Sequence, residues 1–353
     1  MFIKQKRKAN TKKDYFCFMI LVTGGTGLVG SHLLFELASS NQNVRAIYRT
    51  KQKLEVVKKV FSYFSDDADL LFNKIDWVEA NILDIPALTE AFQNINYVYH
   101  CAAFISFDPK DYYELRQINI DGTANIVNLS VANSIKKLCY VSSISTLGTC
   151  DDHSLISEET YWSPEADNSV YGITKYGAEM EVWRGTQEGL GAVIINPGLI
   201  IGAGFWESGS GMLFTKVHRG LSHYVTGTSG YVSVKDVIKC MTQLMESKII
   251  NERFIVVSEN LSFKQFTEMA SKYLMVKAPK KSVTPLMLKI AWRFDWLKSF
   301  ITGKPRSLTK QNANTALTIT NYNNNKIVEA LNFSFTPIKT SIKDVSEQFL
   351  KEH

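Results

Sequence analysis

Short apolar runs alternate with longer amphipathic segments between residues 19 and 198. The apolar runs predict strands at 19–22, 43–48, 76–80, 97–102, 137–143 and 192–198. The segments between them predict helices, among them 31–39, 85–92, 122–133 and 171–186. Strands that are continuously hydrophobic and separated by helices are typical of a parallel sheet covered on both faces. The pattern therefore predicts an α/β fold with a doubly wound parallel sheet.

The alternation stops after Gly198. A loop rich in glycine and aromatic residues covers 202–211, and YVSVKDVIKCM from Tyr231 predicts a strand and helix that return to the first domain. Residues 260–353 show helical patterns and several prolines, which predict a smaller C-terminal substrate domain that caps the open edge of the sheet. The expected division is a leader at 1–18, a larger domain at 19–200 plus 231–258, and a smaller domain at 201–230 plus 259–353.

The net charge of +6 lies mostly in the leader. Residues 1–18 carry a net +5, which leaves +1 for the rest and gives no sign of a nucleic-acid partner. We interpret the leader as solvated and disordered, with contact to nucleic acid or a membrane as the alternative. Its basic stretch runs into a strand and a glycine motif rather than a cleavage site, so it does not predict a signal peptide. Translation could start at Met1 or at Met19.

The five cysteines form no CxxC pair. Such an odd set favours structural thiols in a reducing compartment, and the apolar runs are shorter than the ~20 residues that cross a bilayer. We therefore expect a cytoplasmic protein. His100, His218 and His223 lack metal-ligand spacing with acids or cysteines, so no catalytic metal is predicted.

The segment TGGTGLVG, residues 23–30, directly follows a strand and opens a helix. There Gly24 permits a tight turn, Gly27 lets the backbone approach a pyrophosphate, and Gly30 lets the helix pack closely on the strand. The phosphates would lie against free N–H groups at the positive end of the helix dipole. We expect this Rossmann-like turn to bind a dinucleotide through Gly24, Gly25, Thr26, Gly27, Leu28 and Val29.

The end of the second strand bears on the choice of cofactor. An acid there favours NAD, but the sequence VRAIYRT places Tyr48 at that point and Arg49 after it, with Arg45 and Lys51 near. A carboxylate would repel a 2′-phosphate, whereas a guanidinium can bind it with paired hydrogen bonds. NADP(H) is therefore preferred, while NAD(H) stays open. The alternative is that Arg49 is a surface residue of no special role.

A tyrosine and a lysine lie four residues apart in YGITK, at the start of the helix 171–186. The spacing puts the phenol of Tyr171 and the ammonium of Lys175 on one helix face. A phenol with a pKa of about 10 reacts poorly at neutral pH unless a cation stabilises its anion. The pair gains weight from lying after a dinucleotide motif and shortly after a strand that ends in serines.

That strand ends in YVSSISTLG, with Ser142 and Ser143 at its carboxyl end, where open parallel sheets place ligands. A serine hydroxyl there can donate to a carbonyl oxygen that gains charge as hydride arrives. A serine that merely caps the next turn is the alternative, and it fits Ser142 better than Ser143. The candidate catalytic residues are therefore Ser143, Tyr171 and Lys175.

In their order along the chain, these motifs resemble the extended short-chain dehydrogenase/reductase family. The resemblance covers nearly all of 19–350 and also includes HCAA at 100–103, NIDGT at 119–123, NPGLIIGAG at 196–204 and YVSVKD at 231–236. It implies Tyr171 as general acid/base, Lys175 as ribose binder and tuner of Tyr171, and Ser143 as polariser of the substrate oxygen. It further implies cofactor contacts from Asn81, Ile82, Ala102, Ala103, Asn119, Tyr171, Lys175, Pro197, Gly198 and Leu199. One departure is Asn81, which stands where the family usually has an aspartate.

Several segments resemble reductases more than sugar epimerases. They are VRAIYR, FWESGSGMLF at 205–214, TGKPRSLT at 302–309 and the tail YNNNKIVEALNFSFTP, the last two being similar to dihydroflavonol-reductase-like and 3β-hydroxysteroid-dehydrogenase-like sequences. We predict an NADPH-dependent enzyme that reduces a ketone or aldehyde, or oxidises the matching secondary alcohol. The alternatives are a nucleotide-sugar epimerase or dehydratase with tightly held NAD(P), and a cofactor-binding module without catalysis. Homodimers are common in the resembling family, and the residues leave this open.

The segment PLMLKIAWRFDWLKSFI, residues 285–301, has aromatic and aliphatic residues at helical spacing with three basic residues between them. The favoured interpretation is a helix that packs its apolar face on the core. The alternative is a helix that lies in a membrane interface.

Overall fold

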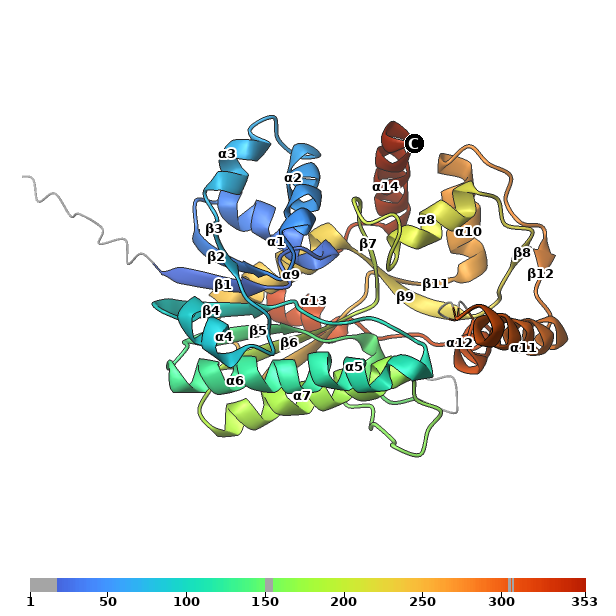
Figure 1. Cartoon of the computed structure of the whole chain (residues 1–353). Helices are drawn as coiled ribbons and strands as arrows, with labels where there is room; N and C mark the ends of the chain where they lie inside the picture. Colours follow the sequence, from blue (N-terminus) through green and yellow to red (C-terminus); the bar gives the residue numbers. More distant parts are fainter. Residues whose placement is uncertain (1–17, 150–154, 304–305, 307) are drawn as a thin grey trace, which may run out of the picture.

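A seven-stranded parallel sheet forms the centre of the protein (Figure 1). The computed structural model describes residues 18–149, 155–303, 306 and 308–353, so the predicted leader lies almost entirely outside the described residues. The sheet has the order β10-β6-β5-β4-β1-β2-β3, and all its neighbouring strands are parallel. Its strands are β1 (Met19–Thr23), β2 (Asn43–Tyr48), β3 (Asp76–Glu79), β4 (Ile95–His100), β5 (Lys137–Val141), β6 (Ala192–Pro197) and β10 (Glu252–Val256).

Both faces of this sheet are covered, which explains why its strands are hydrophobic without alternation. In β1, the side chains of Ile20 and Val22 pack in one core and Leu21 packs in the other. One core is formed with α1 (Leu28–Ser39), α2 (Leu54–Ser62), α3 (Ala68–Asn73), α9 (Val234–Glu246) and α13 (Asn325–Leu331). The opposite core is formed with α4 (Ile85–Ala91), α6 (Gly122–Ala132) and α7 (Val170–Gln187). The predicted doubly wound α/β fold is confirmed.

Helix α6 follows without a break from two short helical segments, α5 (Tyr112–Arg116) and η3 (Gln117–Asp121). Three further short turns connect sheet elements: η1 (Lys51–Lys53), η2 (Pro109–Asp111) and η4 (Ile144–Thr146). The sequence analysis assigned no element to 51–75, where the structure has η1, α2 and α3.

A second layer of structure lies beside the carboxyl ends of the large sheet (Figure 1). A three-stranded sheet of order β11-β9-β7 consists of β7 (Leu199–Ile201), β9 (Thr228–Ser233) and β11 (Glu259–Ser262). It shares a core with α8 (Gly211–His218), α10 (Phe263–Tyr273) and α14 (Ile338–Glu352). Beyond it lie β8 (His223–Tyr224), β12 (Lys281–Ser282), α11 (Pro285–Thr302) and α12 (Lys310–Thr315).

The segment from Tyr231 forms the end of β9 and then α9. Helix α9 packs against α1, β5 and β6. Strand β9 pairs with β7 and β11 rather than with the large sheet, while its Val232 packs in the core shared by α1 and α9. The seventh strand is β10, which pairs with β6 along five residues. The division into two domains stays a prediction.

Helix α11 does not pack its apolar face on the core. Of its 18 residues, only Leu288 and Ser299 are buried. The favoured interpretation from the sequence is therefore wrong, because the body of the protein offers this helix a contact for one narrow face only. Within the described residues, no helix has the length and apolarity needed to span a membrane.

Candidate active site

The predicted site residues follow the ends of parallel strands. The glycine turn follows β1, Arg49 follows β2, and Asn81 with Ile82 lies just after β3. Ala102 and Ala103 follow β4, Ser143 follows β5, and Pro197, Gly198 and Leu199 lie at the end of β6 and the start of β7. Because all these strands are parallel, their carboxyl ends meet at one edge of the sheet, where such folds bind ligands.

The glycine turn between β1 and α1 is formed by close backbone packing. Gly24 has a φ of +69°, and a Cβ on it would lie 2.5 Å from the backbone nitrogen of Ala102. A Cβ on Gly30 would lie 2.2 Å from the carbonyl oxygen of Gly24, so the helix packs directly on the turn. Gly27 is the N-cap of α1 and offers no side-chain cap, which leaves the first helical N–H groups free to face an anion.

Two glycine substitutions separate the packing of this turn from its binding surface. Gly30→Ala is expected to cost about 1–3 kcal/mol of stability, because its methyl group overlaps the backbone of Gly24. Gly27→Ala places its Cβ 3.4 Å from the Gly24 oxygen, an ordinary contact, so its stability should stay within about 1 kcal/mol of wild type. The Gly27→Ala methyl group would instead occupy the pyrophosphate position and weaken dinucleotide binding about tenfold. Thermal unfolding and cofactor titration measure both effects, and equal cofactor affinity in Gly27→Ala and wild type would contradict the assignment.

The basic residues near the end of β2 lie in different surroundings. The guanidinium of Arg45 is already bound by the protein. It pairs with Asp76 at 2.7 Å and donates to the carbonyl oxygens of Ala91 and Gln93. Arg49 and Lys51 are exposed at the carboxyl end of the strand. Arg49 is therefore better placed than Arg45 to meet a cofactor phosphate.

Asn81 and Asn119 have their side-chain oxygens engaged by the protein. Asn81 Oδ1 accepts from the Leu83 N–H at 3.1 Å within its own turn. The buried amide of Asn119 accepts from the Phe104 N–H at 2.8 Å and donates to the Phe104 carbonyl oxygen and Thr174 Oγ1. Asn119 thus joins the segment after β4 to α7, and direct cofactor contact by either residue stays a prediction.

Ser143 and Tyr171 lie near each other at this edge. The Ser143 hydroxyl is close enough to the phenol to lower the pKa of Tyr171, against the larger effect of burial. Ser143 Oγ also accepts from the Ser145 N–H at 3.1 Å as the N-cap of η4, whereas Ser142 Oγ donates to Glu179 Oε2 at 2.6 Å. The expectation that Ser142 is the better capping serine is therefore wrong. Ser143 caps the turn and also lies near Tyr171.

Burial shifts the proton affinities of the tyrosine and the lysine in opposite directions. It raises the pKa of Tyr171 to about 12, against a lowering by the hydrogen bond to Ser143. It lowers the pKa of Lys175 to about 7, opposed by the nearby negative charge of Glu179. Lys175 is 1% exposed and donates to Tyr140 Oη at 2.5 Å and to the Val141 carbonyl oxygen at 2.8 Å. Near neutral pH the phenol keeps its proton while the lysine sits close to its titration point.

A buried polar chain connects the glycine turn to Lys175. Thr23 Oγ1 lies 2.7 Å from His100 Nδ1, and His100 Nε2 lies 2.9 Å from Thr123 Oγ1. The His100 ring stacks on Tyr140 with centroids 5.3 Å apart, and Tyr140 accepts from Lys175. Burial lowers the pKa of His100 to about 3, so its ring is neutral and can accept one hydrogen bond while donating another. From the sequence, His100 is part of the HCAA motif and has no metal-ligand spacing, and neither pattern predicts this contact.

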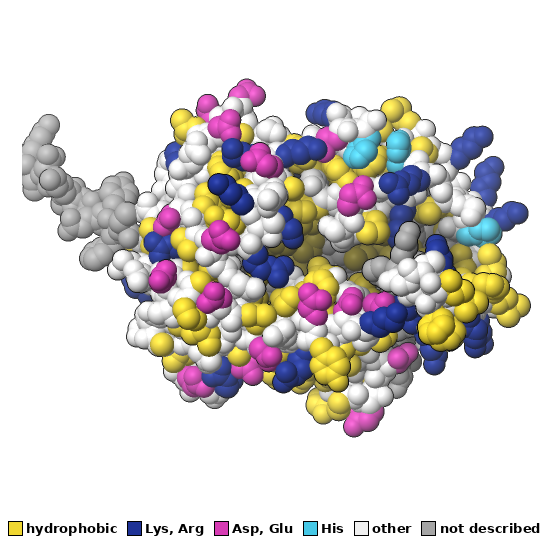
Figure 2. Space-filling view, in the orientation of Figure 1, with side chains coloured by type: hydrophobic (Ala, Val, Ile, Leu, Met, Phe, Trp, Pro, Cys, Tyr) yellow, Lys and Arg dark blue, Asp and Glu magenta, His cyan; other side chains and the backbone are white. Residues whose placement is uncertain are grey.

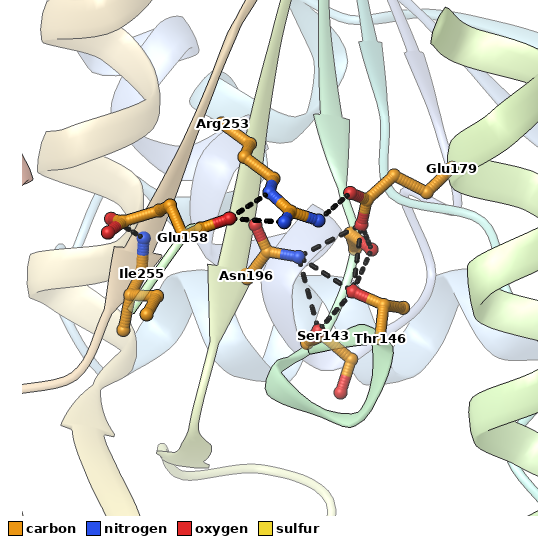
Figure 3. Close-up of polar contacts among 8 residues, drawn as sticks. Ser143, Thr146, Glu158, Glu179, Asn196, Arg253 and Ile255 are labelled. Carbon is orange, nitrogen blue, oxygen red and sulfur yellow. Dashed lines mark hydrogen bonds and ion pairs between the residues drawn. The ribbon is translucent and has the colours of Figure 1, made fainter. Parts of the chain in front are cut away.

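A carboxylate network supports the turn that carries Ser143 (Figure 3). Glu179 is fully buried, and its Oε2 accepts from Ser142, from Thr146 at 2.8 Å and from Asn196 at 2.9 Å. Its Oε1 pairs with Arg253 at 3.1 Å. Asn196 also donates to the Ser143 carbonyl oxygen at 3.2 Å. One buried charge thus fixes both ends of the turn from Ser142 to Thr146.

Arg253 brings a further segment to this network. Its guanidinium donates to the carbonyl oxygen of Glu158, and Glu158 Oε1 accepts from the Ile255 N–H at 2.7 Å (Figure 3). The sequence analysis missed Glu179 and Arg253. The only local signal is that Glu179 follows Lys175 by four residues, which puts both on one face of α7.

Known proteins with similar sequences belong to the same family that the motifs resemble. The sequence model of the NAD dependent epimerase/dehydratase family matches residues 20–257, which is more than half of the chain. The chain belongs to the NAD-dependent epimerase/dehydratase family. This confirms the resemblance to extended short-chain dehydrogenases/reductases, the expected enzyme class and the use of a nicotinamide dinucleotide.

Relatives of this epimerase/dehydratase family member include reductases. A Synechocystis protein named provisionally as a dihydroflavonol 4-reductase is 27% identical over 345 residues, covering 94% of both chains. The dihydroflavonol 4-reductase of Solanum lycopersicum is 27% identical over 252 residues, covering 68% of this chain and 65% of its own. The fold matches that of UDP-glucose 4-epimerase from Thermotoga maritima with a TM-score of 0.74 at 20% identity, over 95% and 99% of the two chains. The family therefore holds enzymes of reductase and epimerase type.

Proposed function

We propose that this family member is an NADPH-dependent oxidoreductase that reduces a ketone or aldehyde, or oxidises the matching secondary alcohol. The observation that carries the proposal is the place of the three residues: Lys175 Nζ donates to the Val141 carbonyl oxygen at the end of β5, two residues before Ser143, and Tyr171 lies one helical turn from Lys175 on α7. The pKa of Tyr171, raised to about 12, suits a group that gives its proton to a substrate oxygen rather than one that removes a proton. Lys175, one helical turn along α7, supplies the neighbouring cation.

The residues of the glycine turn fit a dinucleotide, since the N-terminus of α1 lacks a side-chain cap and Gly27 leaves room for a phosphate. A nicotinamide cofactor bound there would supply the hydride chemistry. Ser143 would donate to the substrate oxygen and hold it beside Tyr171. Tyr171 would give its proton to that oxygen, and the charge of Lys175 would stabilise the phenolate that remains.

The preference for NADP(H) over NAD(H) rests on Arg49. In Arg49→Ala, the affinity for NADPH should fall about tenfold or more while the affinity for NADH changes little, because only NADPH carries the 2′-phosphate. Lys74→Ala is a matched control, since Lys74 is exposed but precedes β3 at the opposite edge of the sheet. Fluorescence titration of both nucleotides measures the effect. The preference for NADP(H) would be contradicted if the wild type bound NADH more tightly than NADPH and if Arg49→Ala changed neither affinity.

An epimerase or dehydratase of a nucleotide-linked sugar is the second candidate. The similar fold of an enzyme named for UDP-glucose supports it, but such a likeness bears on the fold alone. For the reductase we favour a substrate with an apolar ring system, because the Phe107 ring lies 5.5 Å from that of Tyr171 and reductase relatives are named for dihydroflavonols. Oxidation of NADPH by dihydroflavonol and steroid ketones would support this. Turnover of UDP-sugars with retained NAD would favour the second candidate.

The remaining expectations stay predictions. They are a cytoplasmic location and the absence of a catalytic metal, while assembly into a homodimer stays open. A non-catalytic role is the weakest alternative, because the three candidate catalytic side chains are present and two of them lie near each other.

A further inference from the structure

Helix α11 exposes a continuous apolar surface, which we call the apolar stripe. Phe294 is 67% exposed and Ile301 is 72% exposed. On a helix with about 3.6 residues per turn, the stripe lies opposite the two buried positions, Leu288 and Ser299. Its members are Leu286, Met287, Ile290, Phe294, Leu297 and Ile301. Figure 2 shows hydrophobic side chains gathered at the end of the molecule where Figure 1 places α11.

The charges of α11 border this stripe and are almost all positive. Lys289 and Arg293 lie along one side of it, and Lys298 lies along the other. The single acid of the helix, Asp295, is on the side turned to the body, where its carboxylate accepts from the Leu308 N–H at 2.9 Å. The outward face therefore presents apolar side chains between two basic borders.

Further cations precede α11 in the chain, and further aromatic rings lie on the helix beside the stripe. The segment just before the helix, 272–281, has four exposed lysines and no acid. On α11 itself, the rings of Trp296 and Phe300 stack with centroids 5.9 Å apart, and both side chains are exposed. Aromatic rings beside basic residues suit the level of lipid headgroups, where one end of the side chain is apolar and the other is wet.

We propose that α11 docks this protein on an anionic membrane surface, lying in the plane of the interface with the apolar stripe among the acyl chains. The basic borders of α11 would then meet lipid phosphates, which makes the charges complementary. A second copy of the chain is a poorer occupant, because two such faces would bring like charges together.

The segment that follows α11 contacts residues next to the candidate active site, so docking would also position that site; this step rests on the proposed function. Past the helix, the Arg306 N–H donates to Asp108 Oδ2 at 3.2 Å. Asp108 follows Phe107, whose ring contacts Tyr171. A docked molecule would hold its catalytic edge close to the lipid, where an apolar ketone could be taken up.

Flotation of the full chain with lipid vesicles tests the docking without using activity. We expect binding to vesicles of phosphatidylcholine and phosphatidylglycerol, weaker binding to phosphatidylcholine alone, and loss of the difference at high salt. The double variant Phe294→Gln, Ile301→Gln should lower the partition coefficient about tenfold or more, since it removes apolar groups from the stripe. Both residues are exposed, so an unchanged melting temperature shows that the variant is folded.

Leu70→Gln on α3 is the matched control, because Leu70 is an exposed leucine at the other end of the molecule (Figure 1). It should float like wild type. A wild-type chain that stays with the lipid-free fraction would overturn the proposal, as would a stripe variant that floats like wild type, which would assign binding to another region such as the basic leader. Sedimentation without lipid gives the other test. A dimer that the stripe variant abolishes would make this face a contact between copies instead.

Discussion

Tyr171→Phe is expected to lower kcat by about 10²–10⁴-fold, the usual contribution of a positioned proton donor. The change removes only the phenolic oxygen, whose burial raises its pKa to about 12 and so keeps its proton in place at neutral pH. The ring and its contact with Phe107 remain, so the pocket keeps its shape. Affinity for NADPH should stay near wild type, because the glycine turn is untouched. Steady-state rates and cofactor titration measure the two quantities separately.

Tyr176→Phe is the control for this change. Tyr176 lies on the same helix, and its ring stacks on Trp162 with centroids 4.5 Å apart, away from Ser143. Its loss of a hydroxyl group should leave kcat within about twofold of wild type, as for a surface change outside the reacting groups. Equal rates in Tyr171→Phe and wild type would show that the acid/base role is placed on the wrong residue.

Glu179→Gln is expected to cost about 3 kcal/mol of stability, at the lower end for breaking a buried ion pair. The change leaves the Arg253 guanidinium without its carboxylate, although Arg253 keeps the carbonyl oxygen of Glu158. The amide also replaces one acceptor by a donor, while Ser142, Thr146 and Asn196 all donate to this carboxylate. Urea unfolding measures the loss.

The same change should move the pH profile of ketone reduction. The negative charge of Glu179 raises the pKa of Lys175, which burial lowers to about 7. Without that charge the lysine loses its proton at lower pH, and the phenolate formed on Tyr171 loses its stabilising cation there. Reduction should therefore begin to fall at lower pH in the variant than in wild type. A purely structural role of Glu179 would lower stability and leave the profile in place.

Glu181→Gln on the same helix is the control for both measurements. Glu181 pairs with Arg184 at 2.9 Å on the surface, so its loss should cost less than about 1 kcal/mol and leave the pH profile unchanged. If the two variants lost equal stability, the buried network around Glu179 would not be what holds the Ser143 turn.

Local pattern was enough for six of the seven strands of the large sheet, for the glycine turn and for the helix that carries Tyr171 and Lys175. Strand β2 runs over the predicted residues 43–48, because the short apolar run and the polar residues that border it are visible in the local sequence. The spacing of Gly24 and Gly30 is equally local. The two residues are six apart in the chain, and their backbones contact each other where the turn leads into α1. These features depend on residues close in the chain, so neighbours in sequence determine them.

The tertiary structure alone decided which side chains meet across the chain. Glu179 and Arg253 are 74 residues apart, and they meet because α7 packs on β6 and β6 pairs with β10. The sequence also could not tell whether Arg45 or Arg49 is free for a phosphate, because that depends on Asp76 in the neighbouring strand. The apolar face of α11 looked like core for the same reason. Whether an apolar face is buried depends on what packs against it, and that is a property of the assembled fold rather than of the segment.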